Sequence, residues 1–281
     1  MKTQEFYMQR CLQLALKGTG NVSPNPMVGC VVVHNNEIIG EGYHQKYGCF
    51  HAEVNAISRV KDKNLLMNST LYVNLEPCAH FGKTSPCSSL IIAHKIPKVV
   101  IGCIDPYSKV AGKGIKKMEE VGVEVIVGVL GEESRRLNKR FIIFHKKKRP
   151  YIILKWAESK DGFIAPKNQT NPFWMTSSDS KKIAHKWRAE EDAILVGRIT
   201  AEKDNPFLTV RKAKGDNPIR IVLDKNLKLS KNLNLFNYES KTIIFNEIKS
   251  HNDSDKIFIK INFKNMIINI LKELYKQKIQ S

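Results

Sequence analysis

The chain has 281 residues, a length that suits one large or two modest domains, and its 42% hydrophobic content excludes a disordered protein. No run approaches the roughly 20 apolar residues that cross a bilayer. Six cysteines without a secretory leader do not indicate a disulfide framework, so we expect a cytoplasmic protein. The net charge of +19 raises the question of nucleic-acid binding. The lysines are spread along the chain without aromatic interleaving, however, and we expect no nucleic-acid partner.

The first half of the chain alternates between helical and extended patterns. An amphipathic helix is predicted before Gly18, followed by a hairpin of strands 27–34 and 37–43 that turns at Asn35-Asn36. Further helices are predicted at 51–59, from 86 onward, at 111–121 and at 132–145, and further strands at 70–74, 98–103 and 123–127. This alternation predicts an α/β layer structure with a largely parallel sheet.

The charged segment 146–150, closed by Pro150, is the best candidate for a domain boundary. It separates a first domain, 1–146, from a second, 150–281. The apolar run Tyr151–Trp156 is typical of a central strand. Beyond it we predict a helix at 178–190, strands at 193–196, 219–223, 242–245 and 256–261, and a final helix at 264–277.

Four residues of the first domain indicate a zinc-dependent reaction. His51, Cys78 and Cys87 offer one imidazole and two thiolates, and three protein ligands leave the fourth position of a zinc ion to water, as in catalytic sites. Glu53, two residues after the histidine, is placed to move protons. Nucleobase deaminases combine H-x-E with a later P-C and a further cysteine, and their glutamate is an acid/base rather than a ligand. Zinc lowers the pKa of water to about 7, so Glu53 would accept the proton of the attacking water.

Other interpretations of these residues exist. A structural zinc site or a pair of buried free thiols would explain the cysteines alone, but not the adjacent glutamate and the strand–loop–helix settings. His80 is a rival fourth ligand because it lies two residues after Cys78. We interpret it as a substrate contact, since a fourth protein ligand would exclude the water.

The segments 23–29, 42–44, 51–53 and 77–87 together resemble the deaminase half of the bifunctional riboflavin-biosynthesis deaminase–reductase family. The eight residues between the two cysteines match that family, whereas nucleoside and tRNA deaminases typically carry C-x-x-C. The resemblance implies a cytidine-deaminase-like three-layer domain that binds a pyrimidine ribosylamino phosphate. The residues it places around this substrate are Asn25, His44, His80 and Lys83. Each also has a structural interpretation: a turn for Asn25, a strand end for His44 and a solvated side chain for Lys83.

The second half resembles the reductase half of the same family, which is similar to dihydrofolate reductase. The resemblance implies that NADPH contacts Ala157, Trp174, Thr200 and Asp204, and that the substrate contacts Arg188, Leu208 and Arg211. Two arginines suit a phosphate because guanidinium groups donate bidentate hydrogen bonds. Plain packing is the preferred interpretation of Leu208.

The family places a strand and a glycine-rich loop beyond the position that corresponds to residue 281. After Arg198 the only glycine is Gly215, and close backbone approach to a dinucleotide phosphate requires glycine. We therefore expect an incomplete reductase domain that oxidises little NADPH.

The sequence thus predicts a bifunctional deaminase and NADPH-dependent reductase of riboflavin biosynthesis with Zn²⁺ and NADPH as cofactors. The alternative is a deaminase whose second domain is a relic. A basic tRNA or nucleoside deaminase and a non-catalytic zinc-stabilised assembly module are the remaining alternatives. We also expect a homo-oligomer.

Overall fold

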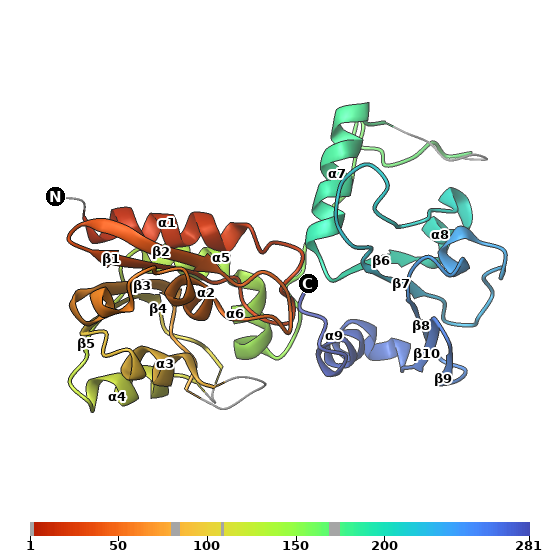
Figure 1. The fold of residues 1–281 in the computed structure, drawn as a ribbon. Coiled ribbons are helices and arrows are strands. Elements are labelled where there is room, and N and C mark those ends of the chain that lie inside the picture. The colour runs from red at the N-terminus through yellow and green to blue at the C-terminus, as the bar shows by residue number, and fades with distance from the viewer. Residues whose placement is uncertain (1–2, 80–84, 108–109, 169–174) are drawn as a thin grey trace. The chain divides into compact units, whose positions relative to one another are not determined.

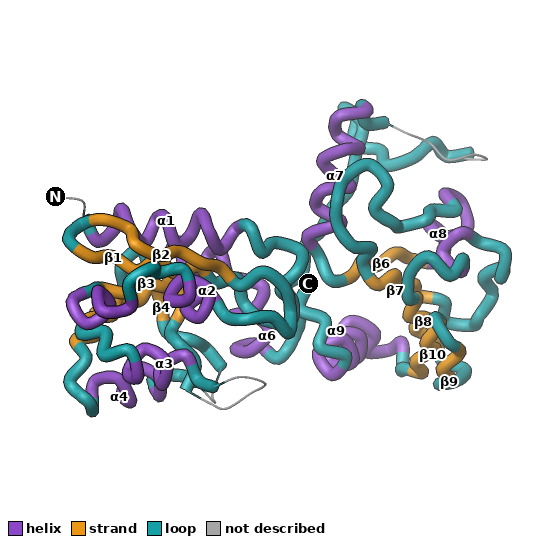
Figure 2. Tube along the Cα trace, viewed as in Figure 1, coloured by secondary structure: helices purple, strands orange, loops and turns teal. Residues whose placement is uncertain are grey.

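The protein is described here by a computed structural model, which defines residues 3–79, 85–107, 110–168 and 175–281. The chain divides into two units, Met1–Lys148 and Arg149–Ser281. Each contains one five-stranded sheet flanked by helices, as the ribbon and the tube trace show (Figures 1 and 2). No helix in the described part of the chain is both long and apolar enough to span a membrane.

In the first unit the strands are ordered β2-β1-β3-β4-β5. They comprise β1 (Gly29–His34), β2 (Glu37–Tyr43), β3 (Thr70–Leu75), β4 (Lys98–Cys103) and β5 (Glu124–Val127). The helices are α1 (Gln4–Leu16), α2 (Ala52–Ser58), α3 (Cys87–Ala93), α4 (Lys113–Glu119), α5 (Gly131–Leu137) and α6 (Lys139–Lys147), with a 3₁₀ segment η1 (Lys63–Asn68). The predicted α/β fold is confirmed, but the sheet is mixed rather than largely parallel. Strand β1 is antiparallel to both β2 and β3, because the hairpin inserts it beside β3, and only β3, β4 and β5 run parallel.

Alternating side chains of the central strands fill two cores, one on each face of this sheet. Val31 of β1 and Tyr72 of β3 face α1, where they pack against Met8 and its neighbours. The intervening residues Val32 and Leu71 face the opposite core. Helices α2, α3 and α4 cover that second face with Ala56, Ile91 and Met118. A sheet between two helical layers is therefore the frame of the first unit.

The β1–β2 hairpin and the close packing of α2 on β2 fix where α2 begins. Asn35 and Asn36 have φ values of 47° and 64°, as the predicted two-residue turn requires. Gly42 lies under α2, and a Cβ on it would meet the Ala56 nitrogen at 2.5 Å. Glycine therefore allows the α2 backbone to lie directly on β2, which sets the position of the residues that open this helix.

The single helix predicted at 132–145 is two helices, α5 and α6, separated at Asn138. The Asn138 amide oxygen accepts from the Met27 N–H at 2.8 Å, and its nitrogen donates to the Met27 carbonyl at 2.9 Å. Asn74 donates to the same carbonyl at 3.1 Å. The helix breaks at a residue whose side chain binds a distant part of the backbone. Such a tertiary contact leaves no trace in helical periodicity.

In the second unit the strand order is β6-β7-β8-β10-β9. The elements are α7 (Ser178–Glu190), β6 (Ala193–Gly197), α8 (Arg198–Asp204), β7 (Ile219–Leu223), η2 (Asn234–Phe236), β8 (Thr242–Asn246), β9 (His251–Asp253), β10 (Lys256–Lys260), η3 (Phe263–Asn265) and α9 (Met266–Lys276). Strands β6, β7, β8 and β10 are parallel, and β9 is antiparallel to β10. Helix α9 covers one face through Ile270 and Leu274, whereas Ala201 of α8 packs on the other.

The prediction of a central strand at Tyr151–Trp156 is wrong. The segment carries no strand assignment, and Leu154 and Trp156 are 78% and 63% exposed. A strand requires a neighbouring backbone along its length. The Tyr151 N–H donates to the Gln280 carbonyl at 2.7 Å, but no strand pairing continues from it in the described residues. An apolar composition is typical of a buried strand, but it does not show whether the fold places another strand beside it.

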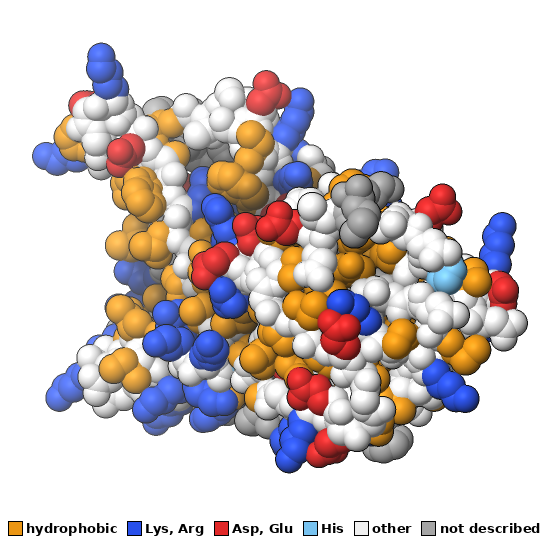
Figure 3. All heavy atoms as spheres, turned by 90° about the vertical axis from the view of Figure 1, so that its left-hand side faces the viewer, with side chains coloured by type: hydrophobic (Ala, Val, Ile, Leu, Met, Phe, Trp, Pro, Cys, Tyr) orange, Lys and Arg blue, Asp and Glu red, His pale blue; other side chains and the backbone are white. Residues whose placement is uncertain are grey.

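Charged side chains are mixed on the surface. On the face shown in Figure 3, basic side chains occur among acidic and apolar ones. Several basic residues form exposed ion pairs with acids three or four residues away, including Lys116 with Glu120 at the end of α4 and Lys182 with Asp179 in α7.

Candidate active site

The three predicted zinc ligands lie together at the ends of three elements. His51 is the residue before α2, Cys78 follows β3, and Cys87 is the first residue of α3. The His51 Nδ1 lies 3.6 Å from the Cys78 Sγ and 3.3 Å from the Cys87 Sγ, and all three donor atoms lie within 4.8 Å of one another. Tetrahedral zinc with bonds of about 2.0–2.3 Å separates such ligands by about 3.5–3.8 Å. The donor set and its spacing therefore fit a zinc ion.

Hydrogen bonds tune these ligands. The Cys87 thiol and the His51 imidazole lower the pKa of Cys78 to about 4, and the Cys87 N–H also donates to the Cys78 sulfur at 3.3 Å. The neighbouring Cys78 sulfur and burial raise the pKa of Cys87, and the hydrogen bond with Cys78 raises the pKa of His51 to about 9. Since a metal binds the thiolate and the neutral imidazole, binding at this site would release protons.

Glu53 is the second residue of α2 and is only 3% exposed. Burial raises the pKa of its carboxyl, although the neighbouring His51 charge acts in the opposite direction. A carboxyl group with a raised pKa exchanges protons more readily near neutral pH than an exposed one. Glu53 thus lies in the first turn of the helix that His51 caps, and its carboxyl interacts electrostatically with His51 and both cysteines.

Two predicted substrate residues of the first unit lie beside the ligands. The His44 ring meets the His51 ring edge to face, with centroids 5.6 Å apart. Its Nδ1 lies 3.0 Å from the Phe50 carbonyl and its Nε2 lies 3.1 Å from the Asn25 amide nitrogen. The carbonyl fixes the proton on Nδ1, so Nε2 accepts from Asn25. Burial lowers the pKa of His44, which favours the neutral ring. His80 and Lys83, the other two predicted contacts, lie outside the described residues.

Several buried polar residues around this site were missed by the sequence analysis. Asn74 and Asn138 hold the backbone of Met27, two residues after Asn25, and Asn74 also accepts from the Gly29 N–H at 2.8 Å. Glu76 and Asp105 lie at the ends of β3 and β4, next to the Cys78 segment. The position of Asn138 inside a predicted helix was the one available signal, because asparagine is a weak helix former.

Asp105 predicts a measurable pH dependence of stability. It is 7% exposed, and burial, followed by the charges of Glu76 and Cys78, raises the pKa of its carboxyl from the ordinary aspartate range to about 7. The folded state therefore holds this proton more tightly than the unfolded state. Its contribution to stability is full below about pH 4 and is lost as the pH rises towards about 7, at up to about 1.4 kcal/mol per pH unit.

We expect Asp105→Asn to remove this loss, because the amide stays neutral and its oxygen still accepts the Tyr107 N–H that now bonds to Asp105 at 2.7 Å. Urea unfolding of the parent and the variant at several pH values between about 5 and 8 measures the difference. The gap between the two free energies of unfolding should widen with pH in favour of the variant. A constant gap would contradict the assignment.

In the second unit, the structure brings together the basic residues predicted to hold substrate. The Arg188 guanidinium donates to the Thr209 carbonyl at 2.7 Å, and its buried Nε has no partner among the described residues. The Arg211 N–H donates to the His185 Nδ1 at 3.0 Å, and its guanidinium lies 4.8 Å over the Phe207 ring. Burial and then the Arg211 charge lower the pKa of Arg188. Two arginines that repel each other form a suitable site for an anion.

The remaining predicted residues of this unit are more dispersed. Leu208 is 6% exposed with φ of 57°, so its side chain packs inside the unit. Thr200 and Asp204 lie one turn apart on α8, Thr200 exposed and Asp204 half-buried, and Ala157 is half-buried in the segment before α7. Trp174 lies outside the described residues.

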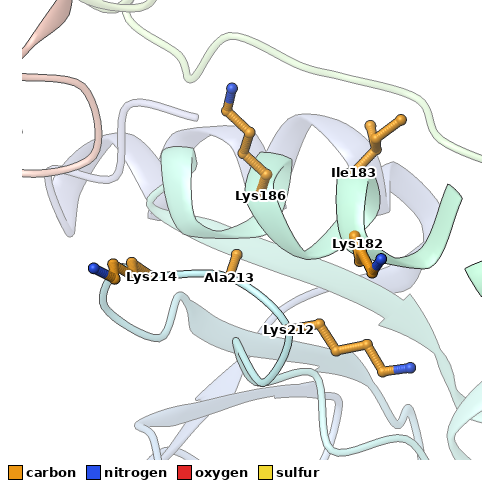
Figure 4. A pocket seen from close by; sticks show the side chains of 6 residues that line it. All are labelled: Lys182, Ile183, Lys186, Lys212, Ala213 and Lys214. Atoms are coloured by element: carbon orange, nitrogen blue, oxygen red, sulfur yellow. The ribbon is translucent and has the colours of Figure 1, made fainter. Parts of the chain in front are cut away.

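A cavity of about 420 Å³ lies between α7 and the loop that follows Arg211. It is lined by Lys182, Ile183, Lys186, Lys212, Ala213 and Lys214. In Figure 4, Lys182, Ile183 and Lys186 extend from the helix, whereas Lys212, Ala213 and Lys214 come from the loop. Four lysines therefore border this cavity.

Known proteins match both units. Residues 1–103 match the cytidine and deoxycytidylate deaminase zinc-binding region, and residues 150–281 match the RibD C-terminal domain. The riboflavin biosynthesis protein RibD of Aquifex aeolicus is 42% identical over 95% of this chain and 77% of its own length. The RibD of Synechocystis is 37% identical over 99% of this chain and 76% of its own length.

Solved structures agree. A diaminohydroxyphosphoribosylaminopyrimidine deaminase/5-amino-6-(5-phosphoribosylamino)uracil reductase from Thermotoga maritima matches with a TM-score of 0.90 and 40% identity, over 99% of this chain and 79% of that chain. A RibD structure from Acinetobacter baumannii matches with a TM-score of 0.90 and 32% identity, over 98% of this chain and 78% of that chain. Sequence, fold and zinc-ligand geometry lead to one conclusion: this chain belongs to the RibD family of riboflavin biosynthesis proteins.

Proposed function

We propose that the first unit hydrolytically deaminates a diaminopyrimidine ribosylamino phosphate through His51, Cys78, Cys87 and Glu53. The observation that carries this proposal is a buried carboxyl group beside three donor atoms spaced for zinc. A zinc ion held there would lower the pKa of water to about 7 and leave room for that water. The membership of the chain in the RibD family supports the same reaction and substrate class.

The residues around the zinc ligands would have different roles in the reaction. Glu53 would accept a proton from the attacking water and return protons to the ring nitrogen and the departing ammonia. His44 and Asn25 are joined by a hydrogen bond at 3.1 Å, and in this pair the amide orientation is fixed by the imidazole. A planar pyrimidine edge could be oriented by the Asn25 oxygen, because Asn74 and Asn138 hold the adjacent backbone in place.

We further propose that the second unit belongs to the reductase step, which uses NADPH. The supporting observation is the group of three positive residues around His185: burial and then the charges of Arg188, Arg211 and Lys212 lower the pKa of this histidine. A ribose phosphate would offset this repulsion and give the buried Arg188 Nε an acceptor. Thr200 and Asp204 on α8 and the half-buried Ala157 are the proposed cofactor contacts, together with Trp174.

Ammonia release tests the first proposal. The 281-residue polypeptide should release ammonia from the diaminopyrimidine ribosylamino phosphate, and a chelator should abolish the activity until zinc is restored. Cytidine and tRNA serve as competing substrates, and faster turnover of either one would overturn the proposed specificity. NADPH absorbance then tests the second step: oxidation with the deaminated product supports the reductase proposal. Ammonia release without NADPH oxidation would leave deamination as the only activity of this polypeptide.

A further inference from the structure

Glu76 is a buried carboxylate at the junction between β3 and the zinc-ligand segment. It is 4% exposed and lies two residues before Cys78. Its Oε2 accepts from the N–H groups of Asp105 at 3.3 Å and Gly112 at 2.9 Å. Its Oε1 accepts from those of Gly114 at 3.0 Å and Ile115 at 3.5 Å. Both oxygens therefore receive backbone donors.

Two of the four donors, Asp105 and Gly112, lie in the connection between β4 and α4, and the other two belong to the first turn of α4. No cation forms an ion pair with Glu76 in the part of the chain that the structure describes. Burial of a carboxylate costs several kcal/mol unless hydrogen bonds replace the water, and the hydrogen bonds that Glu76 accepts from described residues come from backbone N–H groups. The Glu76 side chain thus joins the end of β3 to backbone groups that lie 29 to 39 positions later in the chain.

The contact between these two segments is close. A Cβ on Gly114 would lie 2.1 Å from the Pro77 carbonyl oxygen, so only glycine allows the α4 backbone to approach the residue before Cys78. On the other side of the ligand, Ser88 of α3 donates to the Cys78 carbonyl through its N–H at 3.1 Å and its hydroxyl at 3.0 Å. Two contacts therefore fix the Cys78 backbone: Ser88 binds the Cys78 carbonyl, and Glu76 anchors the preceding residues through Pro77.

We infer that Glu76 is a positioning residue for the zinc site: its carboxylate fixes the Pro77-Cys78 backbone so that the Cys78 sulfur meets His51 and Cys87. It does not contact the reacting atoms. The inference rests on the proposed zinc site. The new element is that the zinc affinity of the site depends on Glu76, although this carboxylate does not itself bind the metal. Glu76 acts through the backbone that connects it to Cys78. Outer residues that orient metal ligands typically change metal affinity by about 10- to 100-fold when they are replaced.

Glu76→Gln is the sharpest test, because glutamine has the same shape but replaces one acceptor oxygen by an NH₂ donor. That donor would face two backbone N–H groups and leave them without an acceptor. We expect zinc release to a chelator to be about 10- to 100-fold faster than in the parent. We also expect the visible absorption of the cobalt-substituted protein to shift, because the Cys78 sulfur moves relative to the other ligands. A general loss of stability would not by itself produce that shift.

Two further variants complete the design. Glu119→Gln changes an exposed glutamate on α4 and should match the parent in both measurements. Glu76→Asp keeps both acceptor oxygens on a shorter side chain and should release zinc at a rate between those of the parent and Glu76→Gln. Glu76→Asp also replaces Glu76→Gln as the test variant if the glutamine variant does not fold.

Parental zinc release and cobalt absorption in folded Glu76→Gln, or in Glu76→Asp where the glutamine variant does not fold, would overturn the inference. A parent protein that binds no zinc, or a Cys78→Ala variant that keeps it, would instead overturn the proposed zinc site.

Discussion

Glu53→Gln is expected to retain zinc and lower kcat for ammonia release by about 10²- to 10⁴-fold, the usual contribution of a general acid/base. The reason is chemical rather than structural. Glutamine matches glutamate in shape, but it exchanges no proton, and Glu53 is proposed to move protons both to and from the same substrate. Its buried position, 3% exposed, gives bulk water little opportunity to replace it.

Zinc content and steady-state kinetics should be measured together for this variant. KM should change much less than kcat, since the carboxyl acts on the reacting atoms rather than on the substrate as a whole. Glu37→Gln, at an exposed position of β2, is the control. Loss of zinc from Glu53→Gln would identify Glu53 as a ligand, and parental turnover would point to another base.

Cys78→Ala should lose both zinc and deamination. Removal of one of three protein ligands leaves His51 and Cys87, and two protein ligands do not close a zinc site of this kind. Bound zinc should fall from about one ion per chain to a small fraction of that, and activity should fall with it. The protein is expected to stay folded, because the two cores of the first unit are built from apolar side chains on both sheet faces.

The matched control is Cys49→Ala, which removes an exposed thiol outside the ligand set. Zinc is counted by elemental analysis after exhaustive dialysis, and folding is followed by circular dichroism. Full activity in zinc-free Cys78→Ala would refute the metal assignment. An unfolded Cys78→Ala that refolds when zinc is added would instead show that the metal has a structural role.

Local signals in the sequence were sufficient for most of the first unit. Asn35-Asn36 between two apolar runs predicted the hairpin, because both residues tolerate the positive φ that its turn requires. The zinc ligands were accessible for a similar reason. His51 and Glu53 are two residues apart, and only eight residues separate Cys78 from Cys87, so their chemistry is readable within short stretches of the sequence.

Longer-range features were not readable in this way. Tyr151–Trp156 has the composition of a buried strand, yet it is exposed, since composition does not provide a neighbouring backbone. The helix predicted at 132–145 breaks where the Asn138 amide pairs with Met27, which is 111 residues away. The proximity of Arg188 and Arg211 likewise depends on how α7 packs against the loop between α8 and β7.

The sequence by itself determined the α/β class, the order of most elements, the zinc chemistry and the family. The tertiary structure decided that β1 lies antiparallel between β2 and β3, that three ligands from separate elements meet within 4.8 Å, and that Glu76 connects the Cys78 segment to α4. The physical reason is the range of the interactions. Turn chemistry, helix periodicity and ligand type act over a few residues, whereas buried carboxylates and amides satisfy their hydrogen bonds with whichever backbone the fold brings to them.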